Sequence, residues 1–144
     1  MSLKNIYKAG SEAEVHFMVA QWLKLQYPDV IFRTDYGAGL KMTMRQAVNQ
    51  KKLQSGDKYP DLFIASPTWQ EVDGLRVITS CGLYLELKKG GTKLKKKNGE
   101  WATPHIAEQA QLMERLERLG YVAEFACGFD EAVERIKAYF NGER

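Results

Sequence analysis

The sequence predicts an α/β fold in which a small mixed β-sheet is flanked by helices. Two observations lead to this prediction. Short apolar runs at residues 62–65 and 83–88 have the length of buried strands, whereas residues 104–119 carry apolar side chains at helical spacing. Since helical and strand patterns alternate along the chain, the helices are expected to cover the faces of one sheet.

The first half of the chain is expected to hold two helices. The first begins at Ser11 and ends before Tyr27, because apolar residues recur every three or four positions between them. Residues 30–34 then resemble a strand, and a glycine-containing loop follows at residues 35–40. Residues 43–53 have a helical composition, so a helical insertion is expected before the strand at residues 62–65.

A hairpin is expected in the middle of the chain, because Asp73-Gly74 is a turn signal flanked by strand-like residues. Further along, Thr103 supplies an N-cap, Pro104 a first-turn proline and Gly120 a helix end. The elements after the hairpin are therefore, in order, a strand at residues 83–88, a helix at 104–119, a strand at 122–126 and a helix at 130–140 capped by Asp130.

Length and composition favour one intracellular domain spanning residues 1–144. A chain of 144 residues is large enough to bury a core without disulfides. The two cysteines match no metal-binding spacing, and no apolar run approaches the roughly 20 residues of a membrane span. The N-terminus lacks the apolar segment of a secretory signal. We therefore expect a cytoplasmic protein that is neither secreted nor bound to a membrane.

Charged residues occur at the ends of two apolar strands. Asp61 precedes the first, while Glu86 and Lys88 stand two positions apart in the second and so point to one face. Partly buried charges are costly unless they have partners or bind a metal. Each position also has an ordinary explanation, because Pro-Asp often starts a turn and Glu86 with Lys88 would suit an exposed strand.

Lysines are concentrated just after this strand. Six of them fall within ten residues, at positions 88, 89, 93, 95, 96 and 97, although the net charge of the chain is only +3. An ordinary interpretation is a solvated hairpin tip. Beside a metal site, however, Lys89, Lys93, Lys95, Lys96 and Lys97 would neutralise phosphates and position a nucleic acid without reading its sequence.

The order of these residues resembles a known nuclease family. Pro60-Asp61 followed by Glu86-Leu87-Lys88 is similar to the PD-(D/E)XK signature. The surrounding residues follow the order of the VRR-NUC (virus-type replication-repair nuclease) family from Ser11 to Ile136. These are Gly56, Gly90-Gly91, Gln109 and the segment 116–122. The resemblance implies a restriction-endonuclease-like core.

The resemblance also implies an activity, namely hydrolysis of DNA phosphodiesters by a Mg²⁺- or Mn²⁺-dependent endonuclease. Asp61 and Glu86 would be the central metal ligands, because Mg²⁺ prefers hard oxygen donors, and the carbonyl of Leu87 would be a further one. Lys88 would hold or deprotonate the attacking water. Gln109, on the inward stripe of its helix, would orient Lys88, a water or a phosphate.

The first helix offers a further carboxylate from two candidates. Glu12 continues the core-facing stripe of Val15 and Val19, whereas Glu14 lies on a more mixed face. Family members carry a glutamate in this helix, so we expect Glu12 to be a catalytic metal ligand, although either register can be aligned. Helix capping after Ser11 is the ordinary alternative for Glu12. His16, one turn further, would reach the site or simply pack.

The resemblance is to stand-alone, phage-type members of this family, which look like compact homodimers suited to branched DNA such as four-way junctions. We therefore expect a homodimer that acts on branched DNA. A minimal nuclease domain gains a DNA footprint by dimerising. No Gly-rich phosphate loop is present, so no nucleotide cofactor is expected. The rival interpretations are a non-catalytic DNA-binding module of the same fold and a nuclease restricted to nicking or trimming ends.

Overall fold

The computed structural model describes residues 7–35, 43–55 and 59–143, so most of the expected glycine loop at 35–40 and Gly56 lie outside the described residues. The elements are α1 (Glu12–Gln26), β1 (Phe32–Thr34), α2 (Met44–Lys52), β2 (Leu62–Ile64), β3 (Thr68–Val72), β4 (Leu75–Ser80), β5 (Leu83–Lys88), α3 (Pro104–Arg118), β6 (Val122–Cys127) and α4 (Phe129–Asn141). This order confirms the expected one, including the helical insertion before β2.

The main sheet is mixed and has the strand order β1-β2-β5-β6. The first three strands pair antiparallel, whereas β6 pairs parallel to β5. β5 is therefore an inner strand, and its residues from Leu83 to Leu87 are all buried. A strand covered on both faces normally carries few charges, which makes Glu86 conspicuous.

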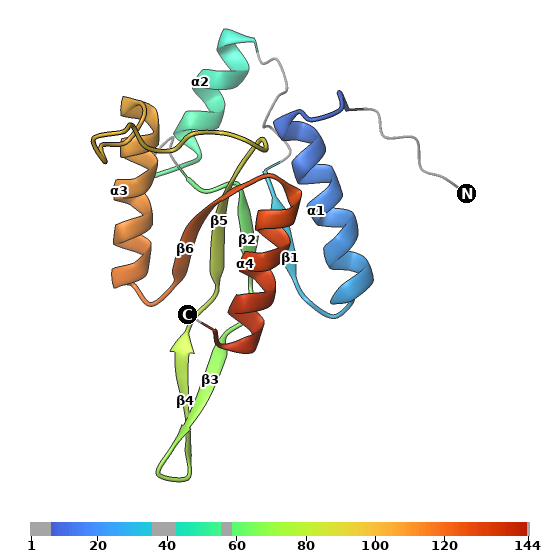
Figure 1. Cartoon of the computed structure of the whole chain (residues 1–144), viewed down its shortest axis with the longest axis vertical. Coiled ribbons are helices and arrows are strands. Elements are labelled where there is room, and N and C mark those ends of the chain that lie inside the picture. Colours follow the sequence, from blue (N-terminus) through green and yellow to red (C-terminus); the bar gives the residue numbers. More distant parts are fainter. Residues whose placement is uncertain (1–6, 36–42, 56–58, 144) are drawn as a thin grey trace.

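Helices cover both faces of this sheet (Figure 1). On one face, α1 and α4 bury apolar side chains against β2 and β5, and this larger core includes the fully buried Leu23, Leu85 and Ile136. On the other face, α3 packs its residues Ile106 and Met113 against β6. The predicted α/β class with flanking helices is thus confirmed.

The two ends of the sheet differ. At one end the β3–β4 hairpin extends away from the body, and it exposes large apolar side chains such as Trp69 and Leu75 (Figure 1). At the other end lie the start of α1, the end of β5 and the lysine-containing loop that follows it. Within the described residues, each helix is too short or too polar to cross a membrane.

The expected bounds agree with the structure to within one residue except at the first strand, and the cap of the last helix also differs. The first strand begins at Phe32 rather than at residue 30, because the Val30 N–H is engaged by the carbonyl of Tyr27. The last helix is capped by Gly128 instead of Asp130, which lies in its first turn. Gly128 has φ 92°, and a Cβ there would come within 3.1 Å of the Gly90 Cα. This close approach of two backbones requires glycine and therefore sets the start of the helix.

Candidate active site

The antiparallel register of β2 and β5 brings Asp61 and Glu86 together. Leu62 pairs with Leu85, so continuing the ladder by one residue places Asp61 across from Glu86. Two charged residues that are distant in sequence thus meet at the end of an inner strand. Glu86 is only 3% exposed. A carboxyl group this deeply buried must be neutral, paired or bound to a cation.

Asp61 is fixed to the backbone of β5. Its Oδ2 accepts the N–H of Leu87 at 3.1 Å. The carbonyl of Lys88 accepts a hydrogen bond from Gly128 on the opposite side, toward β6. Because successive residues of a strand direct their polar backbone groups to alternate sides, the Leu87 carbonyl points toward Asp61. This direction suits the ligand role expected for that carbonyl, which stays a prediction.

Glu86 is contacted by an amide and an ammonium. The Nε2 of Gln109 on α3 donates to its Oε1 at 2.9 Å, and the Nζ of Lys88 lies 3.5 Å from the same oxygen. Gln109 is 5% exposed, so its side chain points at the sheet as expected. We expected the Gln109 amide to orient Lys88, a water or a phosphate. The structure shows it donating to the Glu86 carboxyl, and this hydrogen bond holds that carboxyl in one orientation.

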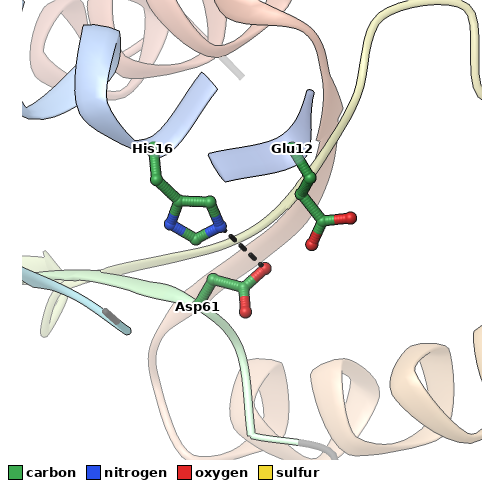
Figure 2. A group of neighbouring side chains, drawn as sticks. All are labelled: Glu12, His16 and Asp61. Carbon is green, nitrogen blue, oxygen red and sulfur yellow. Dashed lines mark ion pairs between the residues drawn. The ribbon is translucent and has the colours of Figure 1, made fainter. Parts of the chain in front are cut away.

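A second group of ligand atoms comes from α1. Glu12, His16 and Asp61 each place one such atom within 4.8 Å of the other two (Figure 2). Glu12 and His16 are one turn apart and therefore lie on the same face of the helix. The Nε2 of His16 is 3.7 Å from Asp61 Oδ2. Asp61 thus belongs to both groups, and its carboxyl joins α1 to the end of β5.

The geometry separates the two glutamates of α1. Glu14 serves the helix start, since its N–H donates to the N-cap Ser11 and its carboxylate accepts the Gly10 N–H at 3.1 Å. Glu12 instead points toward Asp61 (Figure 2). The capping role considered for Glu12 therefore falls to Glu14, and Glu12 remains our candidate ligand.

A matched pair of variants tests this assignment. Glu12→Gln is expected to lower the rate of DNA cleavage by at least about tenfold more than Glu14→Gln, because only Glu12 contributes charge beside Asp61. Single-turnover cleavage rates of the two purified variants give the ranking. Equal losses would show that α1 supplies no ligand, and the reverse ranking would move the role to Glu14.

Burial and neighbouring negative charge raise the pKa values of the two central carboxyl groups. Desolvation raises the pKa of Glu86 to about 9, with the neighbouring Asp61 charge adding to the shift. Desolvation also raises the pKa of Asp61 to about 6, and the Glu12 charge adds to it. At neutral pH the metal-free site therefore keeps a proton on Glu86, whereas Asp61 is mostly ionised. A bound cation would replace that proton, which is typical of clustered acidic ligands.

These shifts predict how stability depends on pH in the metal-free protein. A raised folded-state pKa means that the folded protein keeps a proton that the unfolded chain releases. The free energy of unfolding should therefore fall as pH rises from about 4.5 to about 9, by up to about 1.4 kcal/mol per pH unit for one proton. Urea denaturation in chelator between pH 5 and 9 measures this slope. Glu86→Gln should flatten it, and an unchanged slope in that variant would contradict the buried proton.

Sequence reasoning left the role of His16 undecided between reaching the site and packing. The structure places it 6% exposed beside Asp61, with both ring nitrogens lacking a hydrogen-bond partner among the described residues. Burial lowers the pKa of His16, which favours the neutral ring. A signal was available, because His16 follows Glu12 by one helical turn. A lone histidine, however, gives no indication of its tertiary neighbours.

A cavity of about 490 Å³ opens beside Asp61. It lies between β1, β2 and α2, and it is lined by Arg33, Asp35, Gln50, Leu53, Gln54, Ser55, Tyr59, Pro60, Asp61 and Phe63. The Tyr59 hydroxyl is 2.8 Å from that of Tyr84 on β5, which links the mouth of the cavity to the inner strand. The position of Arg33 and Tyr59 near the site was not apparent from the sequence.

The lysine segment after β5 is an ordered turn. The Lys96 N–H donates to Glu100, and the Ala102 N–H donates to Leu94. Leu94 and Trp101 pack against the α3 core, and the Lys95 Nζ lies 4.8 Å from the centre of the Trp101 ring. Lys89, Lys93, Lys95, Lys96 and Lys97 are exposed. The turn therefore presents its ammonium groups to solvent from a fixed base at the site end of the sheet.

The overall fold is shared with a solved structure. A chain named "VRR_NUC domain protein" is similar to the present one with a TM-score of 0.60 and 25% sequence identity, covering 94% of this chain and 92% of that chain. The chain has the VRR-NUC fold. No family model matches the sequence, and no curated protein matches it either.

The VRR-NUC likeness confirms the family resemblance drawn from the sequence and the restriction-endonuclease-like core that it implied. Because the match extends over nearly the whole of both chains, it includes α1, the inner strand β5 and α3. These are the VRR-NUC elements that carry Glu12, Glu86 and Gln109. The roles of these individual residues stay predictions.

Proposed function

We propose that this VRR-NUC chain is a metal-dependent endonuclease that hydrolyses DNA phosphodiester bonds. The observation that supports it most directly is the convergence of three carboxyl groups and one ammonium at the end of β5. Asp61 is shared by the α1 group and the β5 group, and Lys88 stands beside Glu86. Such a set is costly in a protein without a cation and is the set that phosphodiester hydrolysis needs.

The residues fit a divalent cation. The donors are mostly carboxylate oxygens, which suit Mg²⁺ and Mn²⁺. Two buried nitrogens of His16 lack partners among the described residues, and without a cation the Glu86 carboxyl keeps a proton at neutral pH. Glu12, Asp61, Glu86 and the Leu87 carbonyl would hold the ion. A bound divalent cation supplies Lewis-acid polarisation of the phosphate and lowers the pKa of nearby water.

The remaining residues position the reactants. Hydrolysis adds the oxygen of a water to phosphorus and breaks the bond to the sugar oxygen, and the proton that the water releases is finally taken up by that leaving oxygen. Lys88 is 12% exposed at its side chain, so it reaches solvent at the site and would hold or deprotonate that water. Gln109 keeps Glu86 oriented through its hydrogen bond.

The route for DNA follows from charge. The lysine turn lies at the same end of the sheet as the start of α1 and the end of β5 (Figure 1). Arg33 lines the cavity beside Asp61. Between them the carboxyl groups would repel phosphate unless a cation is bound. We therefore propose that the lysines contact the DNA backbone on one side of the scissile bond, and that the cavity receives the strand on the other.

Replacing Lys93, Lys95, Lys96 and Lys97 together by Ala should weaken DNA binding and reduce its salt dependence. If two to four of them contact phosphate, the log-log slope of affinity against salt should shrink by roughly two to four units. Binding measured from 50 to 200 mM salt gives the slope. Single-turnover cleavage of fully bound substrate should remain nearly unchanged, because these lysines are not among the residues proposed to hold the cation or the attacking water.

The matched control removes two exposed lysines in the second halves of α1 and α4, Lys24 and Lys137. This double Ala variant should keep the parental slope. An equal change in both variants would mean that the lysine turn makes no special contact. The DNA would then have to approach by another face.

We further propose that the substrate is branched DNA such as a four-way junction and that the active form is a homodimer in the cytoplasm. Support comes from the VRR-NUC likeness, and a single domain of this kind offers little surface for a branched duplex. The apolar side chains exposed on the β3–β4 hairpin are consistent with a covered surface. Light scattering after gel filtration measures the assembly.

The deciding experiment incubates labelled linear, flap and four-way DNA with the protein in Mg²⁺, in Mn²⁺ or in chelator. Cleavage within strands that requires the ion supports the proposal, and preference for the four-way form supports the branched substrate. Binding without cleavage under every condition would favour a non-catalytic DNA-binding module. Cleavage confined to ends or to one strand would favour a trimming or nicking nuclease.

A further inference from the structure

His16 has a feature that the proposed chemistry leaves unexplained. Its side chain is buried in α1 at 6% exposure, yet neither ring nitrogen has a hydrogen-bond partner among the described residues. Buried polar atoms are almost always paired, because water is lost on burial without compensation. A simple packing role would favour an apolar side chain here. The imidazole is therefore expected to bind something other than the described residues.

The ring points into the cluster of acidic ligands. Its Nε2 faces Asp61 Oδ2 at 3.7 Å, which is too long for a hydrogen bond (Figure 2). That oxygen already accepts the Leu87 N–H. Ligand atoms that bind one cation at about 2.0–2.2 Å stand about 3–4 Å apart. The distance between His16 and Asp61 lies in this range, and the Glu12 carboxylate completes the group.

We propose that His16 Nε2 is a direct ligand of the divalent cation, together with Glu12 and Asp61, and that it makes this site select Mn²⁺ over Mg²⁺. The inference rests on the proposed function for the presence of a cation at this place. Mg²⁺ demands oxygen donors and keeps its waters, whereas first-row transition ions accept imidazole nitrogen. An all-oxygen set would have no use for a buried histidine.

The direct test is magnetic resonance of Mn²⁺ bound to the full chain after removal of metals. Pulsed EPR detects nuclei within the first coordination shell, so bound Mn²⁺ should show coupling to a nitrogen nucleus. In protein labelled with ¹⁵N-histidine the coupling should change from ¹⁴N to ¹⁵N. This readout needs no substitution and no activity. Tightly bound Mn²⁺ without histidine coupling would overturn the inference.

Two variants make the test selective, because the chain has two histidines. His16→Gln keeps a polar side chain that offers a carbonyl oxygen, so calorimetry should show Mn²⁺ affinity reduced at least about tenfold and Mg²⁺ affinity reduced far less. His105→Gln, at an exposed position in the first turn of α3, should leave both affinities unchanged. Equal losses for the two ions in His16→Gln would refute selection of Mn²⁺ by His16.

Failure of this inference is distinguishable from failure of the nuclease proposal. Metal-dependent cleavage that is lost in Asp61→Asn, with no histidine coupling to bound Mn²⁺, would overturn the role of His16 and leave the nuclease in place. Histidine-coupled Mn²⁺ in a protein that cleaves no DNA would do the reverse. If His16→Gln does not fold by circular dichroism, the labelled parent protein still decides. Absence of Mn²⁺ binding at millimolar concentration would overturn the inference.

Discussion

Glu86→Gln is expected to lower the rate of DNA cleavage at least several hundredfold, corresponding to about 4 kcal/mol of transition-state stabilisation. The change removes the charge of one proposed central ligand but retains size and shape. Gln109 still finds an oxygen acceptor at this position, so the α3 contact survives. Single-turnover rates with saturating DNA measure the effect. Asp61→Asn should lower the cleavage rate in the same way. It should also retain the contact with β5, because an amide oxygen still accepts the Leu87 N–H.

The fold should survive Glu86→Gln, because the metal-free parent already holds a neutral carboxyl there at pH 7. Its pKa is raised to about 9 by burial, so the amide resembles the protonated form. DNA binding should persist or tighten, since a negative charge near phosphate is gone. Glu134→Gln makes the same chemical change on the exposed face of α4 and should leave the rate unaltered. Cleavage by Glu86→Gln within tenfold of the parent would remove this site from consideration.

The relative placement of the central candidate residues could be predicted because it depends on local geometry. Alternation along a strand places Glu86 and Lys88 on one face whatever the rest of the chain does. Helical phase similarly separates Glu12 from Glu14, and the structure shows these two carboxylates in different surroundings. The larger elements were predictable for the same reason, since helix caps such as Thr103 and the apolar stripe of α3 act within a few residues.

Other features depend on contacts between distant segments and could not be predicted. The partner of the Gln109 amide is 23 residues away on β5, and the approach of His16 to Asp61 requires α1 to pack over the end of the sheet. The same holds for the start of α4. Asp130 is a better cap by residue type, but the contact between Gly128 and Gly90 starts the helix earlier. Tertiary packing therefore overrides a sound local preference.

Lys88→Ala should be nearly as inactive as Glu86→Gln but for a different reason. Its Nζ lies 3.5 Å from Glu86 Oε1 and its side chain is 12% exposed, so the ammonium stands beside the carboxyl and is available to the proposed attacking water. Loss of proton transfer or of water orientation costs roughly 10²–10⁴ in rate. Metal binding should persist, because an ammonium is not a ligand. Cleavage rates and Mn²⁺ titration by calorimetry measure the two properties separately.

A second substitution separates charge from packing. Lys88→Met keeps most of the side-chain length over the α3 face, so it should restore any stability lost in Lys88→Ala without restoring cleavage. Lys137→Ala, on the exposed face of α4, should match the parent in both measurements. If either Lys88 variant lost metal affinity together with activity, the ammonium would be acting on Glu86 itself. Its role would then be to keep that buried carboxyl ionised for the cation, since the positive charge of Lys88 opposes the raised pKa of Glu86.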